Sequence, residues 1–534
     1  MGSQFASQQQ PGAAGRHGRV VLVVAAVTAT SLFGLTGCSS VTATKAPTNS
    51  SAGKPVQGGT LTVARTADIF TFDPYNTQDD RSIFTEMELY ERLVKLGADG
   101  KSTEPELATS WSVASNGMSA TFQLRSGVQF SDGTPMTADD VVFSLKRDAD
   151  QRGSWGFLFS PVKDVTKVND HEVKITTSQP FAPLLPALST FAASIYSKAN
   201  SDKYGKAVGS HPLGTGAFKL DTWNKGSELI LGRNPHYWQQ GLPHLDKVIF
   251  KVVGDDNSRV LQLESGAVDA LDAVSPEQVE GLKSKGVNVT EVNGTATTWA
   301  ILNEAKKPLN EANVRLALAW AIDRNAVAST AYFGQAKPAT SILPSSSLYA
   351  TPDVNPPGYD LNKAKQYLSQ SSVPNGFALP ITIPAGDSAA LNTAEIWAAS
   401  LKKIGITLKI NQEEATTAQD EYNTEKFTVR IAPWTNDTPD PDELLGVGLD
   451  YKPQNGLHTG YRSEQARALV TQARQELDPT KRGQLYRQLL QIANRDMPFI
   501  PIVEVPRIFA SASTVHGFTP NTQGKYGFVT AWKK

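Results

Sequence analysis

Apolar and polar residues alternate in several short segments of the chain, and a period of two predicts β-strands. After the turn Gly58-Gly59, residues 60–64 place Leu61 and Val63 on one face. Residues 120–130 alternate in the same way and place Phe122 on one face. Further strands are expected at 247–253, 407–410, 427–431 and 499–505.

Other segments repeat apolar residues every three or four positions, which is typical of helices. This pattern covers 314–330 and 463–477. Asp478 followed by a proline predicts the start of another helix, and Thr137 with Asp140 resembles a capping box. Short strands mixed with helices over 534 residues predict an α/β protein of more than one domain.

The overall charge and composition argue against several functions. The net charge is −1, with no basic stripe, which argues against a nucleic-acid partner. The 7 histidines are scattered, so a dense metal site is not expected. No cofactor is expected either. The chain contains no Gly-x-Ser-x-Gly elbow and no His-Glu-x-x-His helix, which argues against a hydrolase. These features favour binding over catalysis.

The N-terminal segment has the pattern of an export signal. Arg16, His17 and Arg19 precede the apolar run 20–27. The segment ends in Leu-Thr-Gly before Cys38, the single cysteine of the chain, and this resembles a bacterial lipobox. The resemblance implies a signal peptide at 1–37, a diacylglyceryl group on Cys38 and a flexible tether over 38–57. An uncleaved signal anchor is the alternative.

Ordered motifs along the rest of the chain carry a family resemblance. The longest begins at Leu107-Ala108-Thr109-Ser110-Trp111 and continues through Phe122-x-Leu124-Arg125-x-Gly127 and Asp132-Gly133-x-Pro135 to Asp140-Val141. Further blocks are Gly214-Thr215-Gly216-Ala217-Phe218, Arg233-Asn234-Pro235-x-Tyr237-Trp238 and the segment from Val314-Arg315 to Asp323-Arg324. Together they resemble the family 5 extracellular solute-binding proteins of peptide and nickel ABC importers.

The resemblance implies a fold, a location and a partner. It implies a two-lobed periplasmic-binding-protein-like fold with a hinge, an extra subdomain, and a ligand held between the lobes. The expected protein is a monomer on the outer face of the bacterial cytoplasmic membrane, held there by its lipid, that delivers a ligand to ABC transporter permease subunits. By analogy, lobe I covers 58–84, 209–299 and 506–534, the extra subdomain 85–208, and lobe II 300–505.

An acidic stretch, Ala432 to Glu443, follows the expected strand at 427–431. Pro433 is expected to end that strand. Asp440 is expected to act as an N-cap, with Glu443 reaching back three residues later and Asp442 near the positive end of the helix dipole. Three of the four acids therefore have local explanations, and Asp437 has none.

Asp437 lies in a pattern with a known counterpart. The pattern Trp434-Thr435-x-Asp437-x-x-Asp440-Pro441 is similar to the stretch that carries the ammonium-binding aspartate of dipeptide- and oligopeptide-binding proteins. By this resemblance Asp437 would pair with a peptide ammonium, Trp434 would form an apolar wall, and Thr435 and Asn436 are further ligand-binding candidates. The alternative is an Asx-turn aspartate facing solvent.

The remaining contacts and the ligand class stay open. Asn76 and Thr77 follow the first strand and are similar to a lobe I loop at the cleft of the family, so both are ligand-binding candidates. Arg315 is a candidate for a peptide carboxylate, but it belongs to the helix motif and no partner is assigned. A bound oligosaccharide, metal chelate or peptide-like signal is the alternative to a short peptide, and a ligand-sensing lipoprotein is the alternative to transport.

Overall fold

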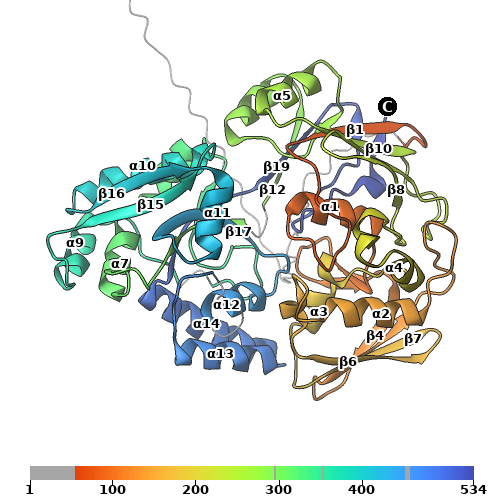
Figure 1. Cartoon of the computed structure of the whole chain (residues 1–534), viewed down its shortest axis with the longest axis horizontal. Coiled ribbons are helices and arrows are strands. Elements are labelled where there is room, and N and C mark those ends of the chain that lie inside the picture. The colour runs from red at the N-terminus through yellow and green to blue at the C-terminus, as the bar shows by residue number, and fades with distance from the viewer. Residues whose placement is uncertain (1–53, 294–295, 352–353, 451–456) are drawn as a thin grey trace, which may run out of the picture. The chain divides into compact units, whose positions relative to one another are not determined.

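The computed structural model describes residues 54–293, 296–351, 354–450 and 457–534. The expected signal peptide and Cys38 lie outside the described residues. The chain from Gly53 to Lys534 forms one compact unit. It contains three large sheets, and helices accompany each of them (Figure 1), so the prediction of an α/β fold is confirmed.

Lobe I is the name used here for the seven-stranded sheet and its helices. Its first strand, β1 (Thr60–Arg65), lies in the middle of the sheet, parallel to β10 and β11. The alternating side chains of Leu61 and Val63 are fully buried, as the pattern predicts. The order is β12 (Asn288–Val292), β19 (Arg507–Ser511), β11 (Ala270–Leu271), β1, β10 (Lys247–Val252), β9 (Glu228–Arg233) and β8 (Phe218–Asn224).

The extra subdomain contains a four-stranded antiparallel sheet. Its order is β4 (Ala108–Val113), β5 (Ser119–Leu124), β7 (Glu172–Thr177) and β6 (Val162–Asn169). Helix α2 (Ala138–Asp148) packs against β6 and β7. The expected capping box at its start is confirmed, because Thr137 and Asp140 each accept a backbone N–H from the other.

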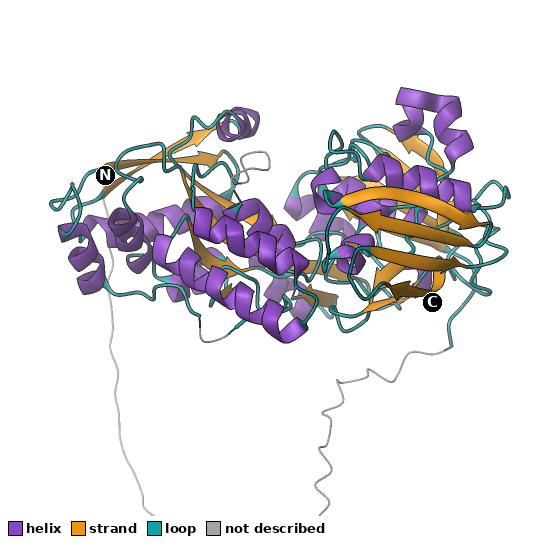
Figure 2. Ribbon diagram, turned by 90° about the horizontal axis from the view of Figure 1, so that it is seen from below, coloured by secondary structure: helices purple, strands orange, loops and turns teal. Residues whose placement is uncertain are grey.

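Lobe II contains a six-stranded sheet covered by helices on both faces (Figure 2). Helices α7 (Ala312–Trp320) and α10 (Ser388–Lys402) share one core with the sheet, and α12 (Asp442–Leu449), α13 (Glu464–Gln475) and α14 (Pro479–Asp496) share another. The strand order is β14 (Lys337–Pro338), β18 (Phe499–Glu504), β13 (Ala296–Leu302), β17 (Val429–Thr435), β15 (Ala378–Pro384) and β16 (Thr407–Glu413).

The chain passes between the two lobes at two places. The first passage lies between β12 of lobe I and β13 of lobe II, and the second between β18 and β19. Because β13 begins at Ala296, residues 296–299 belong to the lobe II sheet. In the second passage only Val505 and Pro506 separate the two strands. Two neighbouring short passages of this kind form a hinge.

Two predicted helix boundaries have different outcomes. Asp478 accepts the N–H of Lys481 and caps α14, as predicted. The single helix expected over 314–330 is wrong: α7 ends at Trp320, and Asp323 caps a new short helix, α8 (Arg324–Ala326). The buried guanidinium of Arg324 binds the carbonyls of Pro357 and Pro501, and these tertiary contacts override the helical pattern.

Candidate ligand-binding site

The acidic stretch connects β17 to α12 in lobe II. The prediction that Pro433 ends the strand is wrong, because β17 continues to Thr435 and Pro433 pairs with Thr298 of β13. On its other side, β17 pairs with β15 at Arg430 alone. Beyond that point, no strand among the described residues pairs with this side of β17. A proline is tolerated at such an edge because it has no N–H to donate.

Asp440 and Asp442 serve mainly as ion-pair partners. Both oxygens of Asp440 bind the guanidinium of Arg482 on α14, at 2.6 and 2.8 Å, and both side chains are buried. Asp442 binds Arg474 on α13 at 2.8 Å. The prediction that Asp440 is the N-cap residue is wrong, because Pro441 occupies that position, although Asp440 accepts the N–H of Asp442. These pairs anchor the start of α12.

Asp437 is buried between the two lobes. Its residue exposure is 7%. Its backbone N–H donates to Glu443 Oε2 at 2.9 Å, and its carbonyl accepts the side-chain amide of Gln523, a lobe I residue, at 2.8 Å. Within the described ranges, no arginine or lysine forms an ion pair with its carboxylate. It is not the solvent-facing Asx-turn aspartate that was the alternative.

The electrostatic surroundings disfavour a negative charge on Asp437. Burial, with a smaller contribution from the charge of Asp80, raises the pKa of Asp437 to about 7, and Arg507 acts in the opposite direction. Burial and the neighbouring Asp437 raise the pKa of Glu443 well above its usual range. A cationic group placed beside these carboxyls would relieve this unfavourable burial.

An arginine of lobe I contacts the same segment from the hinge. Arg507, in β19, donates to Asp80 of α1 (Asp80–Leu89) at 2.9 Å and to Thr435 at 3.3 Å. Its guanidinium lies 4.5 Å from the ring centre of Phe84. Arg507 therefore links the two lobes beside Asp437.

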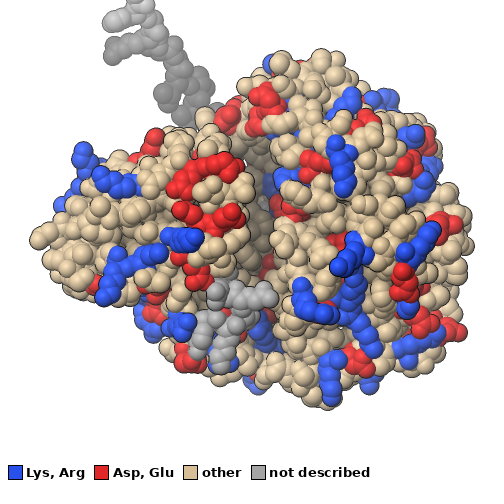
Figure 3. Space-filling view, in the orientation of Figure 1, with Lys and Arg blue, Asp and Glu red and all other residues tan. Residues whose placement is uncertain are grey.

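The extra subdomain also contacts lobe II. The N–H of Ala182 donates to the carbonyl of Arg474 at 2.8 Å, and Gln475 donates to Gln179 at 3.0 Å. Gln523, besides holding the Asp437 carbonyl, reaches the carbonyl of Ser189 at 3.4 Å. Figure 3 shows a hollow between lobe II and the rest of this unit, with acidic side chains on its lobe II margin.

The other candidates in this stretch differ in their surroundings. Trp434 is half-buried, stacks on Trp299 with ring centres 6.2 Å apart, and donates to Asn436 at 3.4 Å. Asn436 is fully buried. Thr435 accepts the bond from Arg507 described above. The structure therefore brings these three candidates together with Asp437 in one segment.

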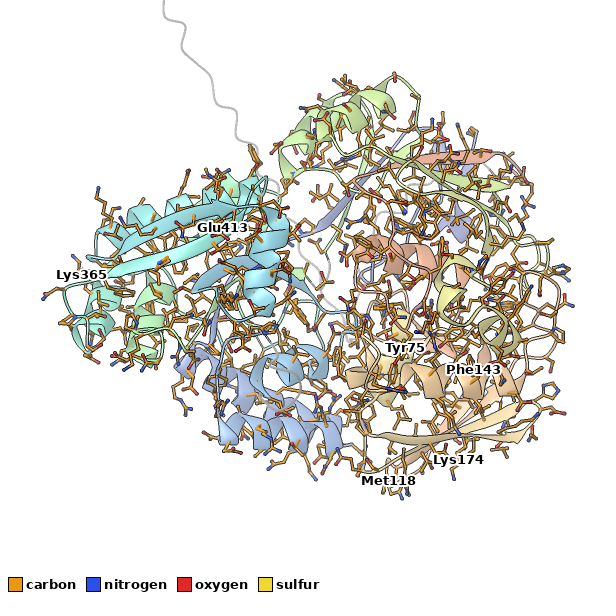
Figure 4. The ribbon with its side chains drawn as sticks, in the orientation of Figure 1. Tyr75, Met118, Phe143, Lys174, Lys365 and Glu413 are labelled. Atoms are coloured by element: carbon orange, nitrogen blue, oxygen red, sulfur yellow. The ribbon has the colours of Figure 1, made fainter. Side chains whose placement is uncertain are left out.

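Asn76 and Thr77 lie in different surroundings. Asn76 donates to Asp73 at 2.8 Å and lines a cavity of about 640 Å³ with Tyr75 and Phe143, which lie near each other in Figure 4. Thr77 is fully buried. Among the described residues, neither side chain forms a hydrogen bond with the segment from Trp434 to Asp437.

Arg315 is not available to a ligand. Its guanidinium binds the carbonyls of Leu309 and Asp496 and lies 3.2 Å from Glu304, all within lobe II. Sequence reasoning missed Gln523 and Arg507, because no local pattern links them to a segment 72 or more residues away. Glu443 was assigned as a capping residue for α12, but it binds the backbone of Asp437 and Thr438 instead.

In the described part of the chain, no helix is both long and apolar enough to cross a membrane. Likewise, no group of three or more histidine, cysteine or acidic side chains among these residues is arranged to hold a metal ion.

Comparison with known proteins identifies relatives over most of the chain. Residues 102–456 match the family model of bacterial extracellular solute-binding proteins, family 5. The glutathione-binding protein GsiB of Escherichia coli O1:K1 is 30% identical over 469 residues, which cover 86% of this chain and 91% of GsiB.

Solved structures share the fold. The periplasmic binding protein DppA of Helicobacter pylori, in complex with the peptide STSA, is 28% identical with a TM-score of 0.81, covering 90% of this chain and 98% of DppA. AgaA of A. tumefaciens R10, in complex with agropinic acid, is 25% identical with a TM-score of 0.80, covering 89% and 99%. The predicted two-lobed periplasmic-binding-protein fold is confirmed.

Proposed function

The chain belongs to the bacterial extracellular solute-binding proteins of family 5, and we propose that it captures short peptides outside the cytoplasm and delivers them to an ABC transporter permease. Members of this family bind solutes for ABC importers and are not enzymes. Membership therefore establishes an extracytoplasmic solute-binding protein. The peptide ligand and the lipid anchor are the proposed parts.

The observation that carries the peptide proposal is the buried carboxyl of Asp437. Its charge is disfavoured by burial, and no arginine or lysine of the described residues is bound to it. A peptide's α-ammonium supplies one positive charge and three N–H donors, which this carboxyl can accept. Trp434, half-buried beside it, offers an apolar surface to the first side chain of the peptide.

A peptide also suits the contacts between lobes. Gln523 and Arg507 hold lobe I against the segment that carries Asp437. A ligand that binds Asp437 through its ammonium and also contacts lobe I adds an attraction that exists only when the lobes are closed, and this shifts the protein towards the closed form.

The lipid anchor is proposed from the sequence at Cys38. A charged segment, an apolar run and a lipobox-like ending precede this cysteine. Acylation at Cys38, followed by the tether to residue 57, would hold the binding unit at the outer face of the cytoplasmic membrane.

A different ligand is the alternative within the same transport role. GsiB binds glutathione and AgaA was solved with agropinic acid, so related proteins take peptide-like and non-peptide ligands. Trp434 stacked on Trp299 is the feature that would favour an oligosaccharide ring. A sensing lipoprotein would use the same site.

Calorimetric titration with matched ligands tests the ammonium contact. The ligands are the peptide Ser-Thr-Ser-Ala, glutathione and the N-acetylated form of each, which lacks the ammonium. Free peptides should bind the protein, and acetylation or Asp437→Asn should each weaken binding by at least roughly a hundredfold, because a buried charge loses its partner. Asp170→Asn, a charge removed from an exposed hairpin turn, is the control. Equal affinity for free and acetylated peptides would refute the contact.

A further inference from the structure

A second carboxyl lies beside Asp437. Glu443, in the first turn of α12, reaches back to the preceding loop, where its Oε2 accepts the N–H of Asp437 at 2.9 Å and that of Thr438 at 3.2 Å. The residue is 2% exposed, and its Oε1 is buried without a hydrogen-bond partner among the described residues. The bonds to Oε2 hold the Glu443 carboxyl against the residue that carries the Asp437 carboxyl.

The neighbouring charges of lobe II are already paired. Asp442 binds Arg474 of α13, and Asp440 binds Arg482 of α14. The Asp437–Glu443 pair has no such partner: within the described ranges, neither acid forms an ion pair with a basic side chain. This pair therefore differs from every other acid of the stretch.

The facing charges of lobe I do not neutralise the pair either. The charge of Arg507 lowers the pKa of Asp437, but Arg507 is bonded to Asp80, whose negative charge raises it. Gln523 is neutral and binds the carbonyl of Asp437, not its carboxyl. Two adjacent buried carboxyls cannot both ionise without a large cost, so one of them retains a proton.

We infer that Asp437 and Glu443 hold one proton between them, and that Glu443 is a positioning residue that limits the site to one negative charge, suited to a ligand with a single ammonium group. The kind of ligand in this inference rests on the proposed function. Its geometry rests on the hydrogen bonds that Glu443 accepts from the loop. The proton has a defined place, because Oε1 is the Glu443 oxygen that no backbone N–H occupies. The side chains of Glu443 and Asp437 lie within hydrogen-bonding reach of each other, so the two carboxyls can share this proton.

The pair also links capture to pH. Burial raises the pKa of Asp437 to about 7 and that of Glu443 well above its usual range. As the pH falls below 7, the Asp437 carboxyl therefore becomes protonated, and burial disfavours the ionised form of Glu443 as well. An ammonium that binds there must release one proton from the pair to solvent, while the ammonium keeps its own. Affinity should consequently fall as the pH falls below 7.

The titration of the ligand-free protein tests the pair directly. Carbon-13 NMR of labelled aspartate and glutamate carboxyls, assigned with Asp437→Asn and Glu443→Gln, should show two coupled steps well above the usual range of a carboxyl, with the Asp437 step near pH 7. Glu443→Gln should remove the Glu443 step and keep the Asp437 step. Asp437→Asn should move the Glu443 step down. Glu280→Gln, an exposed acid in another helix, should leave both steps unchanged. Two uncoupled titrations near pH 4 would overturn the inference.

The affinities of Glu443 variants for glutathione and Ser-Thr-Ser-Ala show whether Glu443 has a positioning role or only a general structural one. Glu443→Gln keeps an acceptor for the loop N–H groups and a donor for Asp437, so affinity at pH 7.5 should stay within about threefold. Glu443→Leu should lower it roughly tenfold or more, because those N–H groups lose their acceptor. Equal losses in the two variants would overturn the role of Glu443. If neither ligand binds the wild-type protein, the proposed function fails while the NMR titration still decides the pair.

Discussion

Replacing Asp437 with asparagine should stabilise the ligand-free protein at alkaline pH. Asparagine has the shape of aspartate and can still accept a hydrogen bond from Glu443, but it has no charge to bury. If Asp437 is kept charged for a ligand, its buried charge destabilises the ligand-free fold, and the variant lacks this destabilisation.

The magnitude follows from the pKa of Asp437. Its ordinary value is 3.8, and burial raises it to about 7 in the folded protein. An acid whose pKa is raised on folding destabilises the fold above its unfolded pKa, and the cost increases until the pH exceeds the folded pKa. One pKa unit corresponds to about 1.4 kcal/mol, so the cost is about 4 kcal/mol at pH 8 and about 3 kcal/mol less at pH 5. The advantage of the variant should therefore grow by about 3 kcal/mol between these pH values.

Urea unfolding at pH 5 and pH 8 measures this difference. Both proteins must first be stripped of ligand by unfolding and refolding, because a bound ligand stabilises the wild type alone. Unfolding midpoints should be compared at unchanged slope, with Asp170→Asn as the control. The reasoning would be refuted if the difference in stability between variant and wild type did not change with pH. It would also be refuted if the wild type were more stable than the variant at pH 8.

Two further substitutions test the supports of the site. Arg482→Met should lower the free energy of unfolding by about 3–5 kcal/mol, because it leaves Asp440 buried without its partner; urea unfolding checks this, and a loss below about 1 kcal/mol would contradict it. Gln523→Ala should speed ligand dissociation by roughly threefold to tenfold, because lobe I loses its bond to the carbonyl of Asp437; stopped-flow release measures this, and an unchanged rate would show that the bond does not hold the closed form.

Local patterns predicted the elements of the fold well where a short segment determines the outcome. The capping box of Thr137 and Asp140 and the cap of α14 at Asp478 depend on neighbours within three residues, and both are present. The continuation of β17 through Pro433 could not be predicted, because it depends on the absence of β15 from one side of the strand at that point.

The candidate site was only partly accessible to sequence reasoning. The motif around Asp437 identified a buried acid in a loop between strand and helix, where open α/β sheets bind ligands. The partner of Asp440 could not be found in this way, since Arg482 lies 42 residues further along the chain and on another helix. Gln523 lies 86 residues from Asp437 and meets it through contact between lobes, which no local pattern encodes.

The most direct test of the central claim is native mass spectrometry of the protein purified from cells without added ligand. The account predicts a series of added masses that match short peptides in the wild type and their absence in Asp437→Asn, with Asp170→Asn behaving as the wild type. A single non-peptide mass retained equally by wild type and Asp437→Asn would contradict the peptide assignment and the role of Asp437 together.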